Sequence, residues 1–464
     1  MSRTIFDISA EIGSGITPLR SNNKYWNSND IPWVKTEQLG EYKIYDANEY
    51  ISSVALQETT IKLWPSKTIS VAMYGEGKTR GNASMLMIPA TTNQACCNIV
   101  VDSKKADYRF LYYWIKNNYE QLRALAGGVR KNLNSDDIKG FPFPECGVST
   151  QTNIADVLSA IDDLIQNNSR ICTELKSMSK TLYDYWFTQF DFPNADGNPY
   201  RTSGGTMEWN EQLKRKIPQG WEIGTIHDLM RIDNVSVNPK KLGDTIMEHY
   251  SIPAFDEDHN PAYESAKTIE SGKYAVAPEC ILTSKLNPHF KRLWDPYCDT
   301  KNAICSTEFI VYRPRESWTR PFCYAVLDSD VFYVHMVENA IASTGSRKRI
   351  QPEISASFAL PIPDEKTMRA FVEIYAPIMD KQKSLRKENR ELTKLRDWLL
   401  PMLMNGQVTV ADPMPSAHIL EFNNQEHEQY DVRQAARSFG EGPTDDTADL
   451  VKEFIKRRKN DSKS

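Results

Sequence analysis

The sequence contains no run of eighteen consecutive apolar residues, and its first residues lack the apolar core of a signal peptide. These absences exclude a membrane span and predict a cytoplasmic chain. The eight cysteines show neither CxxC spacing nor the rhythm of a disulfide framework, and the seven histidines lack the spacing of zinc ligands. We therefore expect free thiols, no structural metal site and no contact with a membrane.

Motifs for independent catalysis are also missing. An adenine methyltransferase needs an Asn or Asp followed by two prolines and an aromatic residue to hold the flipped base. Asn287 is followed by one proline and then His289, and Asn198 is followed by a single proline. No Phe-x-Gly-x-Gly turn for a methyl donor is present, and Pro363-Asp364 is not followed by the acid-x-Lys of a nuclease. The chain is therefore predicted not to be an enzyme by itself.

A glycine-rich segment at residues 72–79 ends like a phosphate-binding loop. However, Ala72 stands where that motif begins with glycine, and no helical pattern follows Thr79. A turn that presents Lys78 and Arg80 to a nucleic-acid backbone is the better interpretation.

The net charge of -5 argues against a simple nucleic-acid coat, because phosphate binding depends on Lys and Arg. The negative charge is concentrated near the end of the sequence, where residues 411–450 hold nine acidic residues against Arg433 and Arg437. The remainder is near neutral, which permits a local basic face. Residues 409–464 are predicted to form an acidic, flexible tail.

The sequence contains a divergent internal repeat. Two proline-rich stops, at residues 141–144 and 360–363, each precede a long amphipathic stretch. Within these stretches Ile161, Asp163, Glu174, Leu175 and Leu182 align with Ile378, Asp380, Glu391, Leu392 and Leu399. The segments before them match only at scattered points, so one frame carries two differently specified globular units.

An α+β fold is predicted for each globular unit, because β-branched runs alternate with turn signals and helical patterns. The expected strands are 68–72, 97–101, 273–277 and 308–312, and a helix is expected from 110 toward 125. The predicted organisation is a first globular domain at 1–149, a helical spacer at 150–190, a linker at 191–216, a second globular domain at 217–364, and a second helical region at 365–408, before the tail.

Both helical stretches have the heptad pattern of a coiled coil. In the first, one seam position holds Ile154, Ile161, Asn168, Leu175 and Leu182, and the other holds Val157, Leu164, Ile171, Met178 and Tyr185. In the second, the seam holds Phe371, Ile374, Ile378, Leu385, Leu392, Leu395, Leu399 and Met402, with Lys381 and Glu388 near its middle. If the helices pack antiparallel, these polar residues lie close to Asn168 and fix the register; local exposure of a helix end is the alternative.

Basic residues occupy matching places before the two helices, at Arg130-Lys131 and Arg347-Lys348-Arg349. Their correspondence favours phosphate contacts that position each unit on a duplex, although a single basic cluster is usually a solvated face. Seven further residues have side chains suited to base edges, with ordinary loop roles as the alternative: Lys35, Thr36, Gln38, Asn93, Gln94, Lys285 and Asn287.

Several segments carry a resemblance to a known family: 31–35, 92–99, the junction from 186–187 through 191–193, 199–200, 203–205, 217–221 and 305–309. On these segments the chain closely resembles the specificity subunit of type I restriction-modification systems, over about residues 5–408. The resemblance implies two target-recognition domains, separated by two long antiparallel helices that act as a ruler. Each domain would recognise one half of a split, asymmetric DNA site. The resemblance assigns no individual residue to a base contact.

The resemblance also implies the partners: double-stranded DNA, two modification subunits docked on the helices, and restriction or translocase subunits. No cofactor is expected on this chain, because S-adenosylmethionine, ATP and Mg²⁺ would bind to those partner subunits. The predicted function is therefore non-catalytic, sequence-specific DNA recognition and assembly. The two alternatives are a self-contained DNA methyltransferase or nuclease, and a coiled-coil adaptor that does not bind DNA.

Overall fold

The computed structural model describes residues 3–75, 77–126, 132–344 and 347–410. The chain divides into two compact units, unit 1 (Met1–Gln166 and Glu391–Ser464) and unit 2 (Asn167–Arg390). The division falls inside both long helices, so each unit contains one globular part and a segment of each helix. Most of the predicted acidic tail, from residue 411 onward, lies outside the described residues.

Unit 1 has a five-stranded sheet in the order β1-β8-β5-β6-β3. Its strands are β1 (Ser9–Ser14), β3 (Lys43–Ile44), β5 (Thr68–Ala72), β6 (Ala83–Leu86) and β8 (Cys96–Val101). The central strand β5 pairs antiparallel with both neighbours and is buried along its length, because its apolar and β-branched residues face the core on both sides. The predicted strands 68–72 and 97–101 are thereby confirmed.

A second, three-stranded sheet of unit 1 has the order β4-β2-β7, in which β2 and β7 run parallel. These strands are β2 (Ile31–Val34), β4 (Glu49–Ile51) and β7 (Thr91–Thr92). The helices of the globular part are α1 (Ile5–Ile8), α2 (Ser53–Glu58), α3 (Tyr108–Asn117), α4 (Tyr119–Ala124) and α5 (Ser135–Lys139). Helix α3 packs on β5 and β6, so the expected helix after residue 110 is present but breaks at Asn118.

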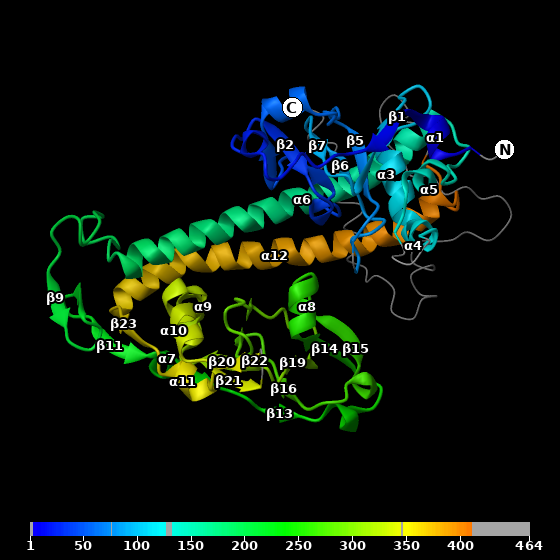
Figure 1. Cartoon of the computed structure of the whole chain (residues 1–464). Helices are drawn as coiled ribbons and strands as arrows, with labels where there is room; N and C mark the ends of the chain where they lie inside the picture. Colours follow the sequence, from blue (N-terminus) through cyan, green and yellow to red (C-terminus); the bar gives the residue numbers. More distant parts are fainter. Residues whose placement is uncertain (1–2, 76, 127–131, 345–346, 411–464) are drawn as a thin grey trace. The chain divides into compact units, whose positions relative to one another are not determined.

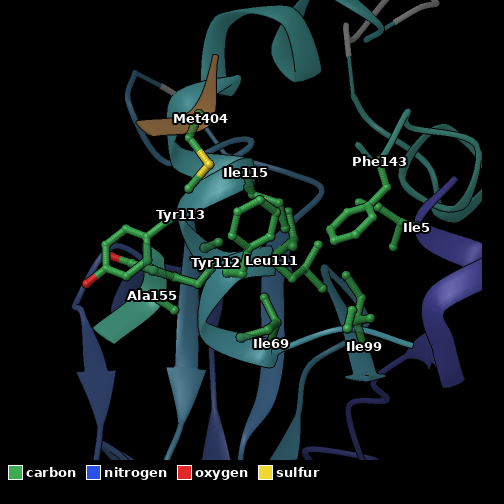
Figure 2. Packing of buried hydrophobic residues seen from close by; sticks show 14 of the residues in the cluster. Ile5, Ile69, Ile99, Leu111, Tyr112, Tyr113, Ile115, Phe143, Ala155 and Met404 are labelled. Carbon is green, nitrogen blue, oxygen red and sulfur yellow. The ribbon is translucent and has the colours of Figure 1, made fainter. Parts of the chain in front are cut away.

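The core of unit 1 lies between the five-stranded sheet, α3 and the long helices (Figure 2). Leu111 and Ile115 of α3 meet Ile69 and Ile99 of the sheet, and all four side chains are fully buried. Met404, at the end of the long helix α12 (Glu365–Met404), belongs to the same cluster. The end of this helix is therefore part of the core of unit 1, although it is distant in sequence from the rest of that core.

Unit 2 repeats this architecture. A four-stranded sheet has the order β12-β20-β17-β18, with the same antiparallel pairings as β1-β8-β5-β6. A second sheet has the order β13-β16-β19-β14-β15, in which the parallel pair β14 and β19 corresponds to β2 and β7. The strands are β12 (Met230–Ile232), β13 (Ser236–Val237), β14 (Ile246–Tyr250), β15 (Ala262–Ser265), β16 (Lys273–Ala275), β17 (Ile281–Ser284), β18 (Leu293–Trp294), β19 (Ala303–Ser306) and β20 (Phe309–Pro314).

Three strand pairs complete unit 2: β9 (Met207–Asn210) with β10 (Arg215–Pro218), β11 (Glu222–Thr225) with β23 (Ala359–Ile362), and β21 (Ile341–Thr344) with β22 (Arg347–Arg349). Its shorter helices are α7 (Ile226–Leu229), α8 (Ile252–Glu257), α9 (Arg320–Asp328), α10 (Asp330–Glu338) and α11 (Pro352–Ala356). The strands expected at 273–277 and 308–312 are confirmed, with ends shifted by a few residues.

The repeat extends to the first short helix of each globular part. The backbone N–H and hydroxyl of Thr4 donate to the Asp7 carboxylate, and those of Thr225 donate to Asp228 in the same way. This reciprocal cap begins α1 and α7 and satisfies backbone groups that a short helix leaves unpaired. The two segments share the pattern Thr-Ile-x-Asp and begin equivalent helices by the same local device.

Two long helices correspond to the predicted coiled-coil stretches, α6 (Val148–Tyr183) and α12 (Glu365–Met404), coloured teal and orange in Figure 1. A π-helical turn, Asp184–Thr188, extends α6. In unit 2 the helices pair antiparallel: Cys172 contacts the carbonyl of Gln382, and further along α6 Tyr183 meets Phe371. None of the described helices is both long and apolar enough to cross a membrane.

One of the two predicted seam positions is wrong by one residue. Met178 is 57% exposed, and Tyr185 and Ile374 are also exposed, although all three were assigned to the seam. The buried positions are instead one residue later, at Ser179 and Tyr375. From Ile154 the buried positions of α6 advance by four residues and then by three, whereas the predicted positions advance by three and then by four.

The expected polar layer in the coiled coil is present in unit 2, with a different partner. Asn168 is buried, and its amide Nδ2 donates to Oδ1 of Asn389 at 3.0 Å. Asn389 in turn donates to Ser169 Oγ at 3.0 Å. Lys381 is exposed, so Asn389, next to Glu388, is the residue that meets Asn168. A buried amide pair of this kind favours one register over its neighbours.

Candidate nucleic-acid interface

Loops that hold most of the predicted contact residues of unit 1 converge at one end of its sheets. Asn93 N donates to Val34 O at 3.1 Å, which joins the turns after the parallel strands β7 and β2. Met73 N donates to Ala95 O at 2.8 Å, and Leu133 N donates to Met73 O at 3.0 Å. The turn at Asn93, the loop after β5 and the segment leading to Leu133 are therefore neighbours.

The glycine-rich loop between β5 and β6 is held by side chains of α4. Tyr119 Oη donates to Lys78 O at 2.6 Å, and Arg123 Nη2 donates to Gly77 O at 2.9 Å. Gly75 and Gly77 have φ values of 138° and 58°, which glycine adopts without strain. A strand follows this loop rather than a helix, so the arrangement differs from a nucleotide-binding loop, as the sequence predicts. Lys78 is exposed and Arg80 is half-buried.

The candidates around β2 divide into two kinds. Lys35 pairs with Glu37 at 2.6 Å and Glu49 at 2.5 Å, and hydrogen bonds to these carboxylates raise its pKa. Gln38 is buried, donates to Asp46 O at 3.2 Å and accepts from the backbone of a neighbouring loop. Gln38 therefore ties its turn to the loop after β3, and the ion pairs of Lys35 compete with any phosphate contact. Thr36 is half-buried in the same turn.

Two other candidates share the turn that precedes β8. Asn93 Oδ1 accepts from Ala95 N at 3.2 Å, so this side chain caps its own turn. Gln94 is exposed and hydrogen-bonds to Thr17 through its side chain.

In unit 2 the structure brings five predicted residues together. Lys285 N donates to Glu308 O at 2.9 Å, and Ile350 N donates to Lys285 O at 3.1 Å, which repeats the contact between Leu133 and Met73. Asn287 N donates to Lys348 O at 2.8 Å, while Lys348 N donates to Asn287 Oδ1 at 2.9 Å. The loop after β17 is thus fastened to strand β22, which holds Arg347, Lys348 and Arg349.

The three basic residues of β22 have different surroundings. Arg349 binds Glu308 through two hydrogen bonds, of 3.0 and 2.9 Å. These bonds lower the pKa of Glu308 and raise that of Arg349, so the pair stays charged over the ordinary pH range. Arg349 therefore fastens β22 to the sheet, whereas Lys348 and Arg347 are exposed. Arg130 and Lys131, their predicted counterparts in unit 1, lie outside the described residues.

Two exposed aromatic residues at this end of the sheets were missed by the sequence analysis. Tyr74 follows β5 and Phe290 follows β17, and their side chains are 41% and 54% exposed. The signal that could have found them is their position after corresponding strands of the two repeats.

The predicted seam residues contribute mainly to the interior of the helix pair. Ile161, Asn168, Leu385, Leu392 and Leu399 are buried, and Leu164, Leu175, Leu182 and Ile378 are half-buried. Docking of another subunit on these helices would therefore rely mainly on other side chains. Within the ranges that the structure describes, no group of three or more His, Cys, Asp or Glu residues could hold a metal ion.

The chain is similar to known proteins both in sequence and in fold. Residues 2–177 match the family model described as the type I restriction modification DNA specificity domain. The MjaIX specificity subunit of Methanocaldococcus jannaschii is 23% identical over 87% of this chain and 92% of its own length. The EcoR124I/EcoR124II specificity subunit of Escherichia coli is 22% identical over 42% of this chain and 49% of its own length.

Among solved structures, the S subunit of a type I restriction-modification system from M. genitalium is similar, with a TM-score of 0.57 and 16% sequence identity. The alignment covers 87% of this chain and 95% of that one. At this identity the similarity supports the fold: two α+β units built on a pair of long helices.

Proposed function

We propose that this chain, a member of the specificity-subunit family of type I restriction-modification systems, recognises a bipartite DNA site for its complex and has no catalytic role of its own. The observation that carries the proposal is the similar arrangement of loops at one end of the sheets in both units. Two units of the same topology gather basic and amide side chains from loops whose sequences differ. Such a pair suits two dissimilar half-sites, because each unit contributes its own base contacts and phosphate contacts.

Several features of the complex belong to the same proposal. Two modification subunits would dock on the helices and supply S-adenosylmethionine binding and adenine N6 methylation. Restriction subunits would supply ATP-driven translocation and cleavage, with Mg²⁺. The chain itself would bind none of these cofactors and would act in the cytoplasm, where the DNA is. Joining two recognition domains raises the effective concentration of the second once the first is bound.

The decisive experiment maps N6-methyladenine at single-base resolution in cells that express the modification subunit with and without this chain. We expect a split methylated motif that is absent without the chain. An unchanged methylome, with the partner shown to be present, would refute the proposal in favour of an adaptor. Methyl transfer by the purified chain alone, with S-adenosylmethionine, would instead establish a self-contained methyltransferase.

A salt titration tests the basic residues directly. Lys348 is exposed on β22, and Lys348→Ala should reduce the slope of log affinity against log salt by about 0.9, the value for one lost phosphate contact. Lys214→Ala is the matched control, because Lys214 is an exposed lysine of the β9–β10 turn, paired with Glu211 at 2.8 Å. Equal slopes for the two variants would remove Lys348 from the interface.

A further inference from the structure

The loops after β5 and β17 occupy the same place in their units. Strand β5 lies between β8 and β6, and β17 lies between β20 and β18, with antiparallel pairing throughout. Each loop begins with a residue whose carbonyl accepts a hydrogen bond from the segment just before a short helix, α5 in unit 1 and α11 in unit 2. These contacts are Leu133 N to Met73 O at 3.0 Å and Ile350 N to Lys285 O at 3.1 Å. The two loops are therefore structural counterparts.

The sequences of these loops differ in almost every respect. The first is rich in glycine, and the second is built on Asn287-Pro288. Both nevertheless expose one aromatic ring, that of Tyr74 in the first and Phe290 in the second. One exposed aromatic residue needs no explanation. Two such rings in matching loops of unrelated sequence are unexpected, because neither ring is among the buried core residues of its unit.

Both loops are tied to neighbouring elements by hydrogen bonds. In unit 1, Tyr119 and Arg123 bind two consecutive backbone carbonyls of the loop. In unit 2, Asn287 makes two hydrogen bonds with the backbone of Lys348, and its φ of 48° sets the turn that leads to Phe290. A ring presented by a fixed loop loses little conformational entropy when it meets a ligand.

The surroundings of both rings suit a nucleic acid. Phe290 packs against the exposed ring of His289, with centroids 4.2 Å apart, and lies in the loop fastened to the basic strand β22. Tyr74 shares its loop with exposed Lys78. Cationic side chains hold the phosphate backbone, and an apolar ring between them can reach the bases.

We infer that Tyr74 and Phe290 are matched base-contacting residues, one in each recognition domain, and that each ring wedges against a base step of its own half-site. The inference rests on the proposed function and adds two specificity-determining residues to it. Insertion of a ring favours steps that unstack easily, so each residue selects sequence through deformability as well as through contact.

The test uses the full chain assembled with its modification subunit, and duplexes that carry the two half-sites given by the methylation map. The adenine analogue 2-aminopurine is placed at successive positions, because its fluorescence rises when the base is unstacked. We expect the wild-type complex to increase the signal at one step in each half-site. Phe290→Ala should abolish the signal in one half-site only and weaken binding roughly tenfold, and Tyr74→Ala should do the same in the other.

Two further variants exclude trivial explanations. Phe290→Tyr should restore the signal, which a loss of folding would not allow. Phe6→Ala is the matched control, because Phe6 is a 61% exposed ring of α1, next to the opposite end of the unit 1 sheet. Normal binding and an unchanged fluorescence pattern in both alanine variants would overturn the inference and leave the proposed function intact. A complex with no split methylated motif would instead refute the proposed function.

Discussion

We expect the loss of Asp162 to weaken strongly the packing of the first globular domain against the long helices. It lies on α6 and is only 5% exposed. Tyr113 Oη of α3 donates to its Oδ2 at 2.7 Å, and Arg396 Nη1 of α12 donates to its Oδ1 at 2.8 Å. One carboxylate thus connects three helices of unit 1. Burial lowers the pKa of Arg396, but the charge and hydrogen bonds of Asp162 outweigh it, so the net shift is upward.

The expected magnitude follows from these contacts. Removing one partner of a buried ion pair costs about 3 to 5 kcal/mol. The lower end applies to Asp162→Ala, because the Arg396 side chain is 28% exposed and also binds Asp397 at 2.8 Å. Asp163→Ala is the matched control: this neighbour is 51% exposed and pairs with Lys43, so its loss should cost under about 1 kcal/mol.

Hydrogen exchange is the appropriate assay, because a chain of two units need not unfold in a single step. Protection of the α3 amides in Asp162→Ala should fall by about 3 kcal/mol, roughly a hundredfold in the opening equilibrium. Combining Tyr113→Phe, Asp162→Leu and Arg396→Met should recover most of this loss, since all three members of the network are then apolar. Equal effects of Asp162→Ala and Asp163→Ala would refute the reasoning.

Three further predictions concern single groups. Asn389→Leu leaves the amide of buried Asn168 without that partner, so it should destabilise the α6–α12 pair of unit 2 by about 1 to 3 kcal/mol. Replacing both asparagines by Leu should reverse the loss. Hydrogen exchange of the α12 amides measures both effects. Burial lowers the pKa of His259 to about 3, so the unfolded chain takes up a proton near pH 6.5 before the folded one does. Stability should therefore fall as the pH drops from 6.5 toward 3, and thermal melting of His259→Gln should show a shallower pH dependence. Burial raises the pKa of Cys96 to about 12 and of Cys97 to about 11, so mass spectrometry should find both unmodified by a thiol reagent at pH 8 until the chain is denatured.

The regular elements were predictable wherever local pattern and burial agree. Helix α12 spans residues 365–404 of the predicted helical region 365–408, and β5 spans the predicted 68–72. In the first case an amphipathic period persists over many turns, and in the second a run of β-branched residues is buried on both faces. Such segments depend little on the rest of the chain.

The second seam position was not predictable because the helix offers two apolar candidates side by side. Val157 and Leu158, Leu164 and Ile165, and Ile171 and Cys172 are adjacent pairs. Periodicity alone cannot choose between neighbours, so the partner helix decides. The choice places Ser179 in the interior and Met178 in solvent, against their hydrophobicity.

The contact residues were predictable by segment but not by role. Sequence chemistry treats Lys348 and Arg349 as equivalent, yet they are neighbours on a strand and point to opposite sides. Arg349 meets Glu308, a residue distant in sequence, and Lys348 remains exposed. Gln38 likewise points inward and bonds to the loop after β3. Assigning such roles requires the three-dimensional arrangement of the loops.

The charges of the repeated helices explain how one frame can hold two dissimilar globular domains. On α6, Asp156 binds Arg109 of unit 1 at 2.6 Å. On α12, Lys387 binds Asp299 of unit 2 at 2.5 Å. The first globular domain therefore binds an acidic residue of the helices, and the second binds a basic one.

Each helix nevertheless carries the charges that both kinds of docking need. In the alignment of the repeats, Asp156 and Asp163 of α6 correspond to Glu373 and Asp380 of α12, and Arg170 corresponds to Lys387. Glu373, Asp380 and Arg170 are exposed. Each long helix thus carries both acidic and basic positions, and each globular domain binds those that complement its own surface.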